Sequence, residues 1–213
     1  MRPPLRVWAW SEGVRNFGDE LGPVLLERLG YPVERVDTID RADILTCGSL
    51  LEHAEREATP GTIVWGSGLM CGGHADLSHL DVRAVRGPLT VRAAGLDPTT
   101  PVGDPAELVP ELWTKPRFTR GVGVVRHYID KREYPWADAV IDADQPVDEV
   151  IEFIGSCRAV ASSSLHGLIV AAAWGLDTLR LPHPQVAGDD FKWLDWLTSL
   201  GSYNAIDPKV LPQ

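Results

Sequence analysis

The chain has few cysteines, and none of them forms a recognisable pair. Its 213 residues include three, at positions 47, 71 and 157, which are far apart and show no CxxC spacing. A disulfide framework uses paired cysteines, and a thiolate zinc site uses closely spaced ones. The sequence suggests neither kind of site, and a reducing cytoplasm is the expected location.

The sequence also has no long apolar run and no excess of basic over acidic residues. The longest apolar stretch, residues 165–176, contains His166 and two glycines and is shorter than the roughly 20 residues that span a bilayer. Residues 1–10 carry charge and do not resemble a signal peptide. The 30 acidic and 20 basic residues give a net charge of -10, which disfavours non-specific binding to nucleic acid or anionic membrane. We expect a soluble protein without a transmembrane segment or nucleic-acid partner, in which a few placed cations hold any anionic ligand.

Three motifs of cofactor and nucleophile sites are incomplete. The turns at 121–126 and 66–71 begin like a dinucleotide fingerprint but lack its third glycine. The six histidines show no HExxH spacing, and Ser67 lies in a Gly-Ser-Gly run that is too short for the GxSxG nucleophile elbow. The sequence therefore predicts no NAD site, no catalytic metal and no resident cofactor.

Short β-branched runs alternate with helical patterns along the whole chain, which predicts an α/β fold with parallel sheets. A hydrophobic content of 44% suffices for the core of one domain or of two small lobes. The proline-rich, charged segment 104–120 is the expected linker, which divides the chain into lobes 1–113 and 114–213. The expected strands are residues 5–10, 44–46, 63–65, 82–85, 122–125, 139–141, 159–161 and 178–181.

Three helices have clear sequence signals. Residues 20–29 have apolar spacing, with Asp19 as the expected N-cap and a glycine just past the end. Apolar residues between 147 and 154 follow the spacing of one buried helix face, with Pro146 as the expected first helical residue. Residues 189–200 predict a terminal helix that packs on a sheet or across the lobes.

The most informative stretch contains three consecutive serines, Ser162, Ser163 and Ser164, followed two residues later by His166. A short strand precedes it and an apolar helix follows it. The start of a helix offers N–H groups without helical partners and the positive end of the helix dipole, and both favour phosphate or carboxylate. His166 in isolation would more often be a structural histidine, but this setting favours a functional one.

Two pairs of basic residues follow expected strands. Arg83 and Arg86 flank the end of one strand, and a guanidinium there can bind a carboxylate or phosphate through two parallel hydrogen bonds. Of the two, Arg86 is better placed to reach a ligand. Arg126 and His127 repeat the arrangement after a later strand. The alternative is that these arginines are solvated.

Further candidate binding residues lie in turns after strands. Asn16, Gly18 and Asp19 follow the first expected strand, although for Asp19 in isolation an N-cap is the better interpretation. Glycine-rich turns would let a ligand approach the backbone at Gly48, Gly66 and Ser67, or they are simple tight turns. Lys192, in the expected terminal helix, is either a further anion-binding cation or a solvated charge.

Taken in order, these motifs resemble the polysaccharide pyruvyl transferase family. The central segment of the resemblance is Ser-Ser-Ser-Leu-His-Gly-Leu-Ile at 162–169, followed by an alanine-rich helix and a glycine. Four stretches agree in order before it, and a fifth, at 191–196, follows it. The four are Asn-Phe-Gly-Asp-Glu-Leu at 16–21, Val-Arg-Gly-Pro-Leu-Thr at 85–90, Val-Gly-Asp-Pro-Ala at 102–106 and Val-Val-Arg-His-Tyr at 124–128.

The resemblance implies an enzyme that moves the pyruvate unit of phosphoenolpyruvate onto two hydroxyls of a sugar as a ketal and releases phosphate. It implies two Rossmann-like lobes facing a cleft, as in glycosyltransferases of the B type. It also implies a cytoplasmic role in bacterial cell-envelope polysaccharide synthesis, with a free or lipid-linked carbohydrate acceptor. In this hypothesis His166 protonates the donor, Arg86 binds its carboxylate or phosphate, and Asp19 or His127 is the base.

Two other functions fit the same residues. A nucleotide-sugar glycosyltransferase would bind its diphosphate at the same serine-rich helix start. A non-catalytic anion- or glycan-binding relative would keep the fold and lose the reaction.

Overall fold

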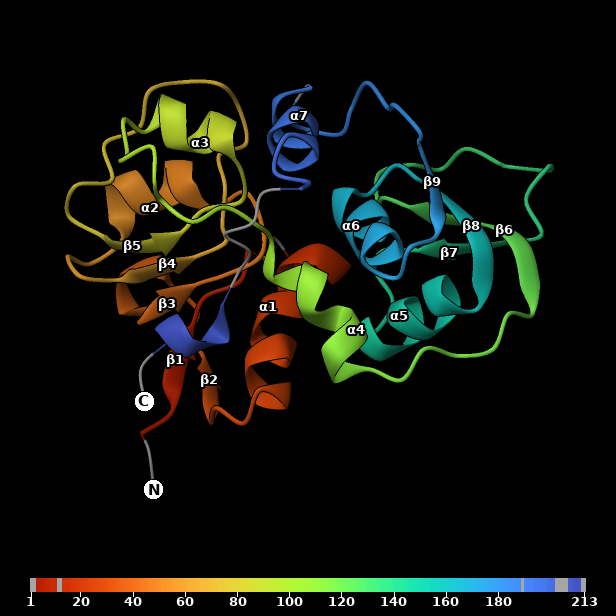
Figure 1. The fold of residues 1–213 in the computed structure, drawn as a ribbon, viewed down its shortest axis with the longest axis horizontal. Coiled ribbons are helices and arrows are strands. Elements are labelled where there is room, and N and C mark those ends of the chain that lie inside the picture. The colour runs from red at the N-terminus through yellow and green to blue at the C-terminus, as the bar shows by residue number, and fades with distance from the viewer. Residues whose placement is uncertain (1–2, 11–12, 189, 202–206, 212–213) are drawn as a thin grey trace. The chain divides into compact units, whose positions relative to one another are not determined.

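A computed structural model describes residues 3–10, 13–188, 190–201 and 207–211. It is an α/β protein with two sheets, and every strand pairing in both sheets is parallel. The predicted fold class is confirmed in this respect (Figure 1). The first sheet has the order β2-β1-β3-β4-β5 and the second β7-β6-β8-β9. The strands are β1 Leu5–Val7, β2 Val33–Arg35, β3 Ile44–Leu45, β4 Ile63–Trp65, β5 Asp81–Ala84, β6 Arg120–Arg126, β7 Ala139–Asp142, β8 Cys157–Ser162 and β9 Asp177–Arg180.

All eight expected strands are present within a few residues, and one strand was missed. β2 has a single apolar residue and is largely exposed at the edge of the first sheet, so it lacks the β-branched run that identifies the others. The α-helices are α1 Phe17–Arg28, α2 Leu51–Glu57, α3 Pro88–Ala93, α4 Val109–Leu112, α5 Val147–Gly155, α6 Leu165–Ala173 and α7 Phe191–Leu197. Short 3-10 helices occupy Ile39–Arg41, Pro105–Leu108 and Pro208–Val210.

Two of the expected helix starts need correction. Helix α1 begins at Phe17, so Asp19 lies inside it, and the expectation that Asp19 is the N-cap was wrong. The carbonyl of Asn16 instead accepts the N–H groups of Asp19 and Glu20, while its side-chain oxygen accepts the N–H of Gly18. Pro146 is the N-cap of α5 rather than its first helical residue.

The expected linker is partly helical. Residues 105–112 form a 3-10 helix followed by α4, and Ala106 and Val109 are fully buried there. Two of its prolines, Pro105 and Pro110, lie at helix starts, where proline is favoured. The boundary between the two compact units, at Pro105 and Ala106, falls within this segment. The role of 104–120 as a linker stays a prediction.

The chain forms two compact units. The first contains Met1–Trp10, Gly22–Pro105 and Gly188–Gln213, and the second contains Ser11–Leu21 and Ala106–Ala187. The division into domains 1–113 and 114–213 stays a prediction, because compactness is not a measure of independent folding. The predicted cleft between two lobes likewise stays a prediction.

Each unit has its own apolar core. In the first, Leu45, Val64 and Val85 from three neighbouring strand regions are buried together with residues of α2. In the second, α5 and α6 pack against β6 and β8 and against each other. Buried β-branched residues of the central strands and of α6 supply this core.

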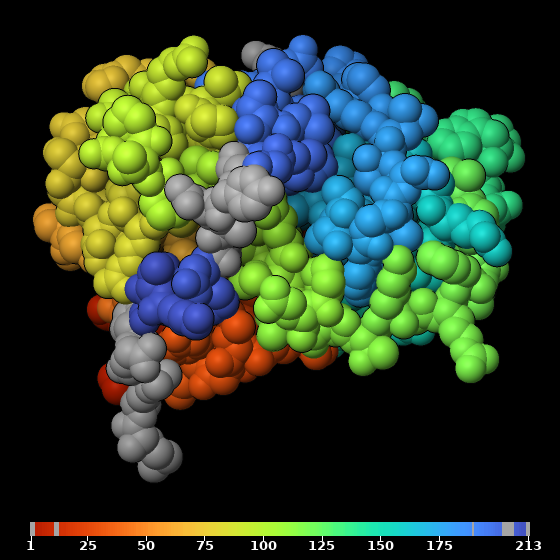
Figure 2. All heavy atoms as spheres, viewed as in Figure 1, coloured from red at the N-terminus to blue at the C-terminus, as the bar shows by residue number. Residues whose placement is uncertain are grey.

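The predicted terminal helix is confirmed as α7, although residue 189, where it was expected to start, lies outside the described residues. Within the first unit α7 packs on α3, and the two are seen as adjacent blue and yellow-green atoms in Figure 2. No helix among the described residues is long and apolar enough to cross a membrane.

Candidate functional site

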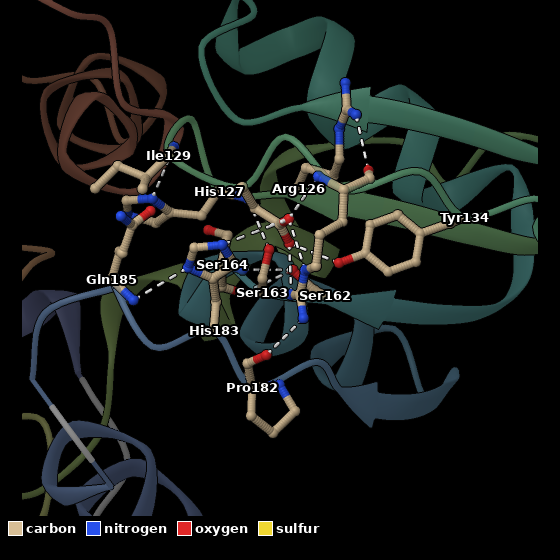
Figure 3. Close-up of polar contacts among 12 residues, drawn as sticks. Arg126, His127, Ile129, Tyr134, Ser162, Ser163, Ser164, Pro182, His183 and Gln185 are labelled. Carbon is tan, nitrogen blue, oxygen red and sulfur yellow. Dashed lines mark hydrogen bonds and ion pairs between the residues drawn. The ribbon is translucent and has the colours of Figure 1, made fainter.

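Strand register brings several predicted site residues to one edge of the second sheet. Val125 of β6 pairs with Ser162 of β8, which in turn pairs with Arg180 of β9. The segments that leave these three strands therefore start side by side at the carboxyl edge, where open parallel sheets bind ligands. Figure 3 shows Arg126 and His127, the three serines, and His183 gathered at this edge.

The serine-rich run forms the predicted strand-to-helix turn. β8 ends at Ser162, and α6 begins at Leu165 with Ser164 as its N-cap. The hydroxyl of Ser162 is fully buried, lies 2.7 Å from the carbonyl oxygen of Val125 and accepts the N–H of Ser164 at 2.9 Å. This hydroxyl therefore shapes the turn, and a substrate contact by Ser162 stays a prediction.

The other two serines differ from each other. The hydroxyl oxygen of Ser163 accepts the backbone N–H of His127 at 3.0 Å. Ser164 is buried, but its side chain does not cap α6. Of the three hydroxyls, that of Ser164 is best placed to act with the first N–H groups of α6 on an anion.

His166 lies in the first turn of α6 and is only 7% exposed. A Cβ added at Gly18 would lie 2.1 Å from its Nδ1, so the imidazole packs directly on the backbone of the α1 start. The adjacent Asp19 is 8% exposed and accepts a hydrogen bond from the Asn16 side-chain amide at 2.6 Å. The fold thus brings together the 16–19 motif and the His166 motif, which are about 150 residues apart in the sequence.

Arg126 is held flat against its neighbouring strand. Its Nε and second terminal nitrogen bind the two oxygens of Asp142 at 2.7 and 3.0 Å. Hydrogen bonding to Asp142 raises the pKa of Arg126 above its ordinary value, so the guanidinium stays charged. Ligand binding by Arg126 stays a prediction.

The ring of His127 has a defined orientation. Its Nδ1 accepts the backbone N–H of Ile129 at 3.3 Å, which places the proton of the neutral ring on Nε2. The ring also packs against Tyr128, with the two centroids 4.3 Å apart. The roles of His127 as a ligand-binding residue or as a base stay predictions.

Asp130 is a central residue of this edge that sequence reasoning missed. It is fully buried, and its carboxylate accepts two side-chain bonds from Arg132 at 2.9 and 2.8 Å and one from the Tyr134 hydroxyl at 2.6 Å. His183 Nε2 lies 3.9 Å from one of its oxygens. No motif marks Asp130 in the sequence, because its partners come from two loops.

Opposing effects set the charge of Asp130. Burial alone would raise its pKa, but the bonds from Arg132 and Tyr134 outweigh burial and hold the pKa well below the ordinary aspartate value. Burial and the bond to Asp130 in turn raise the pKa of Tyr134 to about 12. Asp130 is therefore ionised and Tyr134 neutral at physiological pH.

The remaining candidates lie in the first unit, where Arg86 is fully buried. Its Nε binds Asp195 at 3.2 Å, and its two terminal nitrogens bind Ser49 Oγ at 2.7 Å and the Leu69 carbonyl at 2.6 Å. A Cβ at Gly68 would lie 2.5 Å from the guanidinium carbon, so backbone packs against it as well. These contacts anchor Arg86 within the protein, and its role toward a substrate stays a prediction.

Arg83 and Lys192 occupy different surroundings. Arg83 pairs with the exposed Asp81 at 2.7 Å and contacts the carbonyl of Val210. Lys192 is 8% exposed, so the interpretation as a solvated charge was wrong, and its Nζ lies 3.9 Å from the sulfur of Met70. Anion binding by either residue stays a prediction.

The two glycine turns of the first unit are joined to each other. Gly48 and Gly66 have φ values of 111° and 89°, which favour glycine. The hydroxyl of Ser67 donates to the Gly48 carbonyl at 2.9 Å and accepts the Leu50 N–H at 3.3 Å. The conformation of the two turns explains why glycine occupies positions 48 and 66 and serine occupies position 67. Backbone contact with a ligand at these residues stays a prediction.

The predicted site residues thus form two sets, one in each unit. Those of the first unit are Gly48, Gly66, Ser67, Arg83, Arg86 and Lys192, and those of the second are Asn16, Gly18, Asp19, Arg126, His127, Ser162, Ser163, Ser164 and His166.

Comparison with known proteins finds relatives that are similar to this chain over most of its length. The chain is 30% identical to the succinoglycan biosynthesis protein ExoV of Rhizobium meliloti, over 92% of this chain and 65% of that protein. It is 27% identical to an uncharacterized protein of Acanthamoeba polyphaga mimivirus, over 66% of this chain and 55% of that protein. The chain therefore spans about two thirds or less of the length of these curated relatives.

A solved structure supports the fold, and a family model supports the resemblance. A functionally uncharacterized protein from Klebsiella pneumoniae matches with a TM-score of 0.55 at 13% identity, covering 94% of this chain and 90% of that one. The model of the polysaccharide pyruvyl transferases matches residues 16–175, a range that includes the α1 start, the serine-rich turn and His166. The chain belongs to the polysaccharide pyruvyl transferase family.

Proposed function

We propose that this protein transfers the pyruvate unit of phosphoenolpyruvate to two hydroxyls of a polysaccharide sugar, forming a cyclic ketal and releasing phosphate. The observation that carries the proposal is the position of His166. It lies in the first turn of α6, behind the serine-rich turn, and packs on Gly18 of a second family motif.

The proposed donor suits the chemistry of this edge. Phosphoenolpyruvate carries a phosphate and a carboxylate, and the protein has a net charge of -10, so local donors must bind it. The first N–H groups of α6, the hydroxyl of Ser164 and the Nε2–H of His127 are donors of this kind. We assign the phosphate to this group.

In the proposed reaction His166 donates a proton to the methylene carbon, which makes C2 electrophilic. A sugar hydroxyl oxygen then attacks C2 and gives up its proton to a base. The bond between C2 and the bridging oxygen breaks, and phosphate leaves with the electron pair. A second hydroxyl closes the ketal, and the two hydroxyl protons replace the one that His166 gave and protonate the phosphate.

Asp19 is the better candidate for the base. Asp19 follows Gly18, on which His166 packs, in the chain, and the Asn16 side-chain amide donates to its carboxylate at 2.6 Å. His127, the other sequence candidate, has Nδ1 occupied by the Ile129 N–H.

The acceptor and the location are part of the same proposal. We assign the acceptor to a polysaccharide or its lipid-linked precursor in the bacterial cell envelope. We place the reaction in the cytoplasm, because phosphoenolpyruvate is a cytoplasmic metabolite.

The test is phosphate release from phosphoenolpyruvate with a panel of galactosides, glucosides and mannosides, with mass spectrometry of the sugar product. Replacing His166 by Gln should lower turnover by roughly 10²–10⁴-fold, the usual contribution of a general acid, while circular dichroism shows an intact fold. Full activity of His166→Gln would contradict the acid role.

Donor binding separates the proposal from its alternatives. Phosphoenolpyruvate at about 100 times its dissociation constant should stabilise the protein by about 2.7 kcal/mol in thermal unfolding, and nucleotide-sugars should not. Stabilisation by a nucleotide-sugar alone would favour a glycosyltransferase. Donor binding without turnover of any acceptor would favour a non-catalytic binding protein.

A further inference from the structure

Trp136 is an exposed tryptophan in the loop between β6 and β7. All eight tryptophans of the chain lie in the part that the structure describes, and seven of them are buried or partly buried. Trp136 is 52% exposed, although burial of so large an apolar ring would be favourable. Single exposed apolar side chains are common on protein surfaces, so the way in which this one is held decides its meaning.

The turn that carries Trp136 is fixed from both sides. The N–H of Ala137 donates to the Tyr134 carbonyl at 3.0 Å, which closes a turn with Pro135 at its second position. On the far side the N–H of Asp138 donates to a carbonyl of β6 at 2.9 Å. The protein therefore presents Trp136 to solvent from an ordered turn, and little backbone freedom is lost when a partner binds there.

Tyr134 holds the ring of Trp136 and connects it to the carboxyl edge of the second sheet. The two rings meet edge to face, with centroids 5.7 Å apart and planes at 79°. The hydroxyl of Tyr134 donates to Asp130 at 2.6 Å, and the guanidinium of Arg132 lies 5.6 Å from the centre of its ring. In Figure 3 this hydroxyl points toward the serine-rich turn and the ring points away from it. Trp136, which packs on the ring, is thus one tyrosine side chain removed from the serine-rich turn.

The polar groups around Trp136 indicate the kind of ligand. Lys131, Glu133 and Asp138 are exposed on the same loop, so charges of both signs flank the ring. The two carboxylates disfavour an anionic partner such as nucleic acid or an acidic membrane. One large exposed ring is also too small for a stable protein interface. A sugar suits it, because the C–H groups of a sugar ring form an apolar face that packs on indole, and sugar hydroxyls bond to charged side chains.

We propose that Trp136 forms a distal subsite for the carbohydrate acceptor and stacks on a sugar residue other than the one that receives pyruvate. The proposal rests on the function proposed above and makes it more specific, because the acceptor is then a chain of sugars that occupies both places. Tyr134 is the positioning residue of this subsite, since its ring contacts Trp136 while its hydroxyl is bonded to Asp130.

The experiment compares Trp136→Ala and Trp136→Phe with the unaltered protein. The probes are the methyl glycosides of galactose, glucose and mannose, and linear oligosaccharides of the same sugars. One readout is the affinity for each probe without donor, from NMR titration, in which the indole N–H of Trp136 is followed in the unaltered protein. The other is kcat and KM for each acceptor with phosphoenolpyruvate. Phe118→Ala is the matched control, because Phe118 is also an aromatic residue of the second unit and is 49% exposed.

We expect the oligosaccharides, and not the methyl glycosides, to shift the indole signal. Trp136→Ala should weaken oligosaccharide binding by about tenfold or more, because it removes an aromatic contact. The KM for oligosaccharide acceptors should rise by a similar factor, while the KM for phosphoenolpyruvate and the turnover of methyl glycosides stay unchanged. Trp136→Phe keeps a ring and should recover most of the loss. Tyr134→Phe, which loses the bond to Asp130, should show a smaller loss of the same kind.

Several results would overturn the proposal. They are unchanged oligosaccharide affinity in Trp136→Ala, an equal loss in Phe118→Ala, an equal loss for the methyl glycosides, and a panel in which no oligosaccharide binds. If Trp136→Ala instead lost only binding to phosphatidylglycerol vesicles, Trp136 would be a membrane contact. Should Trp136→Ala fail to fold, Trp136→Phe and Tyr134→Phe keep an aromatic ring at both positions and test the same subsite.

The titrations need no donor, so failure of this inference and failure of the proposed function are distinguishable. A protein that binds oligosaccharides through Trp136 and transfers no pyruvate would retain the subsite and lose the function. Pyruvyl transfer to oligosaccharides with the same KM in Trp136→Ala would retain the function and exclude the subsite.

Discussion

At the scale of single residues, the closest link between two family motifs is the contact of Gly18 with His166. The sequence offers each motif separately, one at a helix start and one at a strand-to-helix turn. In the folded protein the two motifs are in direct contact at Gly18 and His166. Only a residue without Cβ leaves room there for the imidazole. The acid proposed for the reaction is therefore oriented by a backbone surface.

Gly18→Ala tests this orientation. Gly18 lies in α1, where alanine would normally favour the helix by roughly 0.5–1 kcal/mol over glycine. Here the new Cβ would meet His166 Nδ1 at 2.1 Å, so we expect a destabilisation of about 1–3 kcal/mol and a fall in kcat of at least about tenfold. Urea unfolding and steady-state kinetics measure the two effects.

Gly73→Ala is the control for this substitution, because a Cβ at Gly73 would meet nothing within 4 Å. It should leave both quantities unchanged. If Gly18→Ala were as stable and as active as this control, the close packing of His166 on α1 would not matter for the reaction.

At the scale of elements, the loop from β6 to β7 is held in place by its charges. Two arginines of this region are paired with carboxylates, Arg126 with Asp142 and Arg132 with Asp130. The second pair includes a fully buried carboxylate, which the protein keeps ionised by supplying donors from neighbouring segments. The ionisation of Asp130 therefore makes the stability of the protein depend on pH.

The pKa of Asp130 gives the direction of this coupling. It is lower in the folded protein than the ordinary value of about 3.9, so the unfolded state binds a proton first as pH falls. The stability from Asp130 is fully present above about pH 5 and is lost as pH falls through the ordinary value toward the folded one. We expect the melting temperature of the unaltered protein to fall more steeply between about pH 5 and pH 3 than that of Asp130→Asn.

Calorimetry across this pH range measures the difference in slope. Parallel curves for the two proteins would show that another carboxylate accounts for the acid sensitivity. Above about pH 5 the variant should be less stable at every pH, because its amide has one acceptor oxygen in place of two and no negative charge to pair with Arg132.

At the scale of the whole chain, the sequence allowed the sheets and the main anion-site motif to be predicted, because both have local signals. β-branched runs mark eight of the nine strands found in the described residues, and small hydroxyl residues before an apolar helix mark the start of α6. The edge strand β2 has no such run, and the short helices of 105–112 start at prolines that carry no clear helical pattern in the sequence. Asp130 and Asp195 could not be found in this way, because their partners are set by the fold.

Asp195 of α7 connects this helix to α3 within the first unit. Its two oxygens accept the Thr90 N–H at 2.8 Å and hydroxyl at 2.7 Å, which caps the start of α3 from a different helix. One of them also binds the buried Arg86, 109 residues away in the sequence. A Cβ at Gly87 would meet the Asp195 carbonyl at 2.0 Å, so the two backbones are in contact.

Asp195→Ala should therefore destabilise the protein by about 3–5 kcal/mol, because it leaves the guanidinium of Arg86 buried without its counter-charge. The control is Asp81→Ala, which removes an exposed partner of Arg83 and should cost less than about 1 kcal/mol. Urea denaturation gives both values, and equal costs would show that the buried pair contributes little to stability.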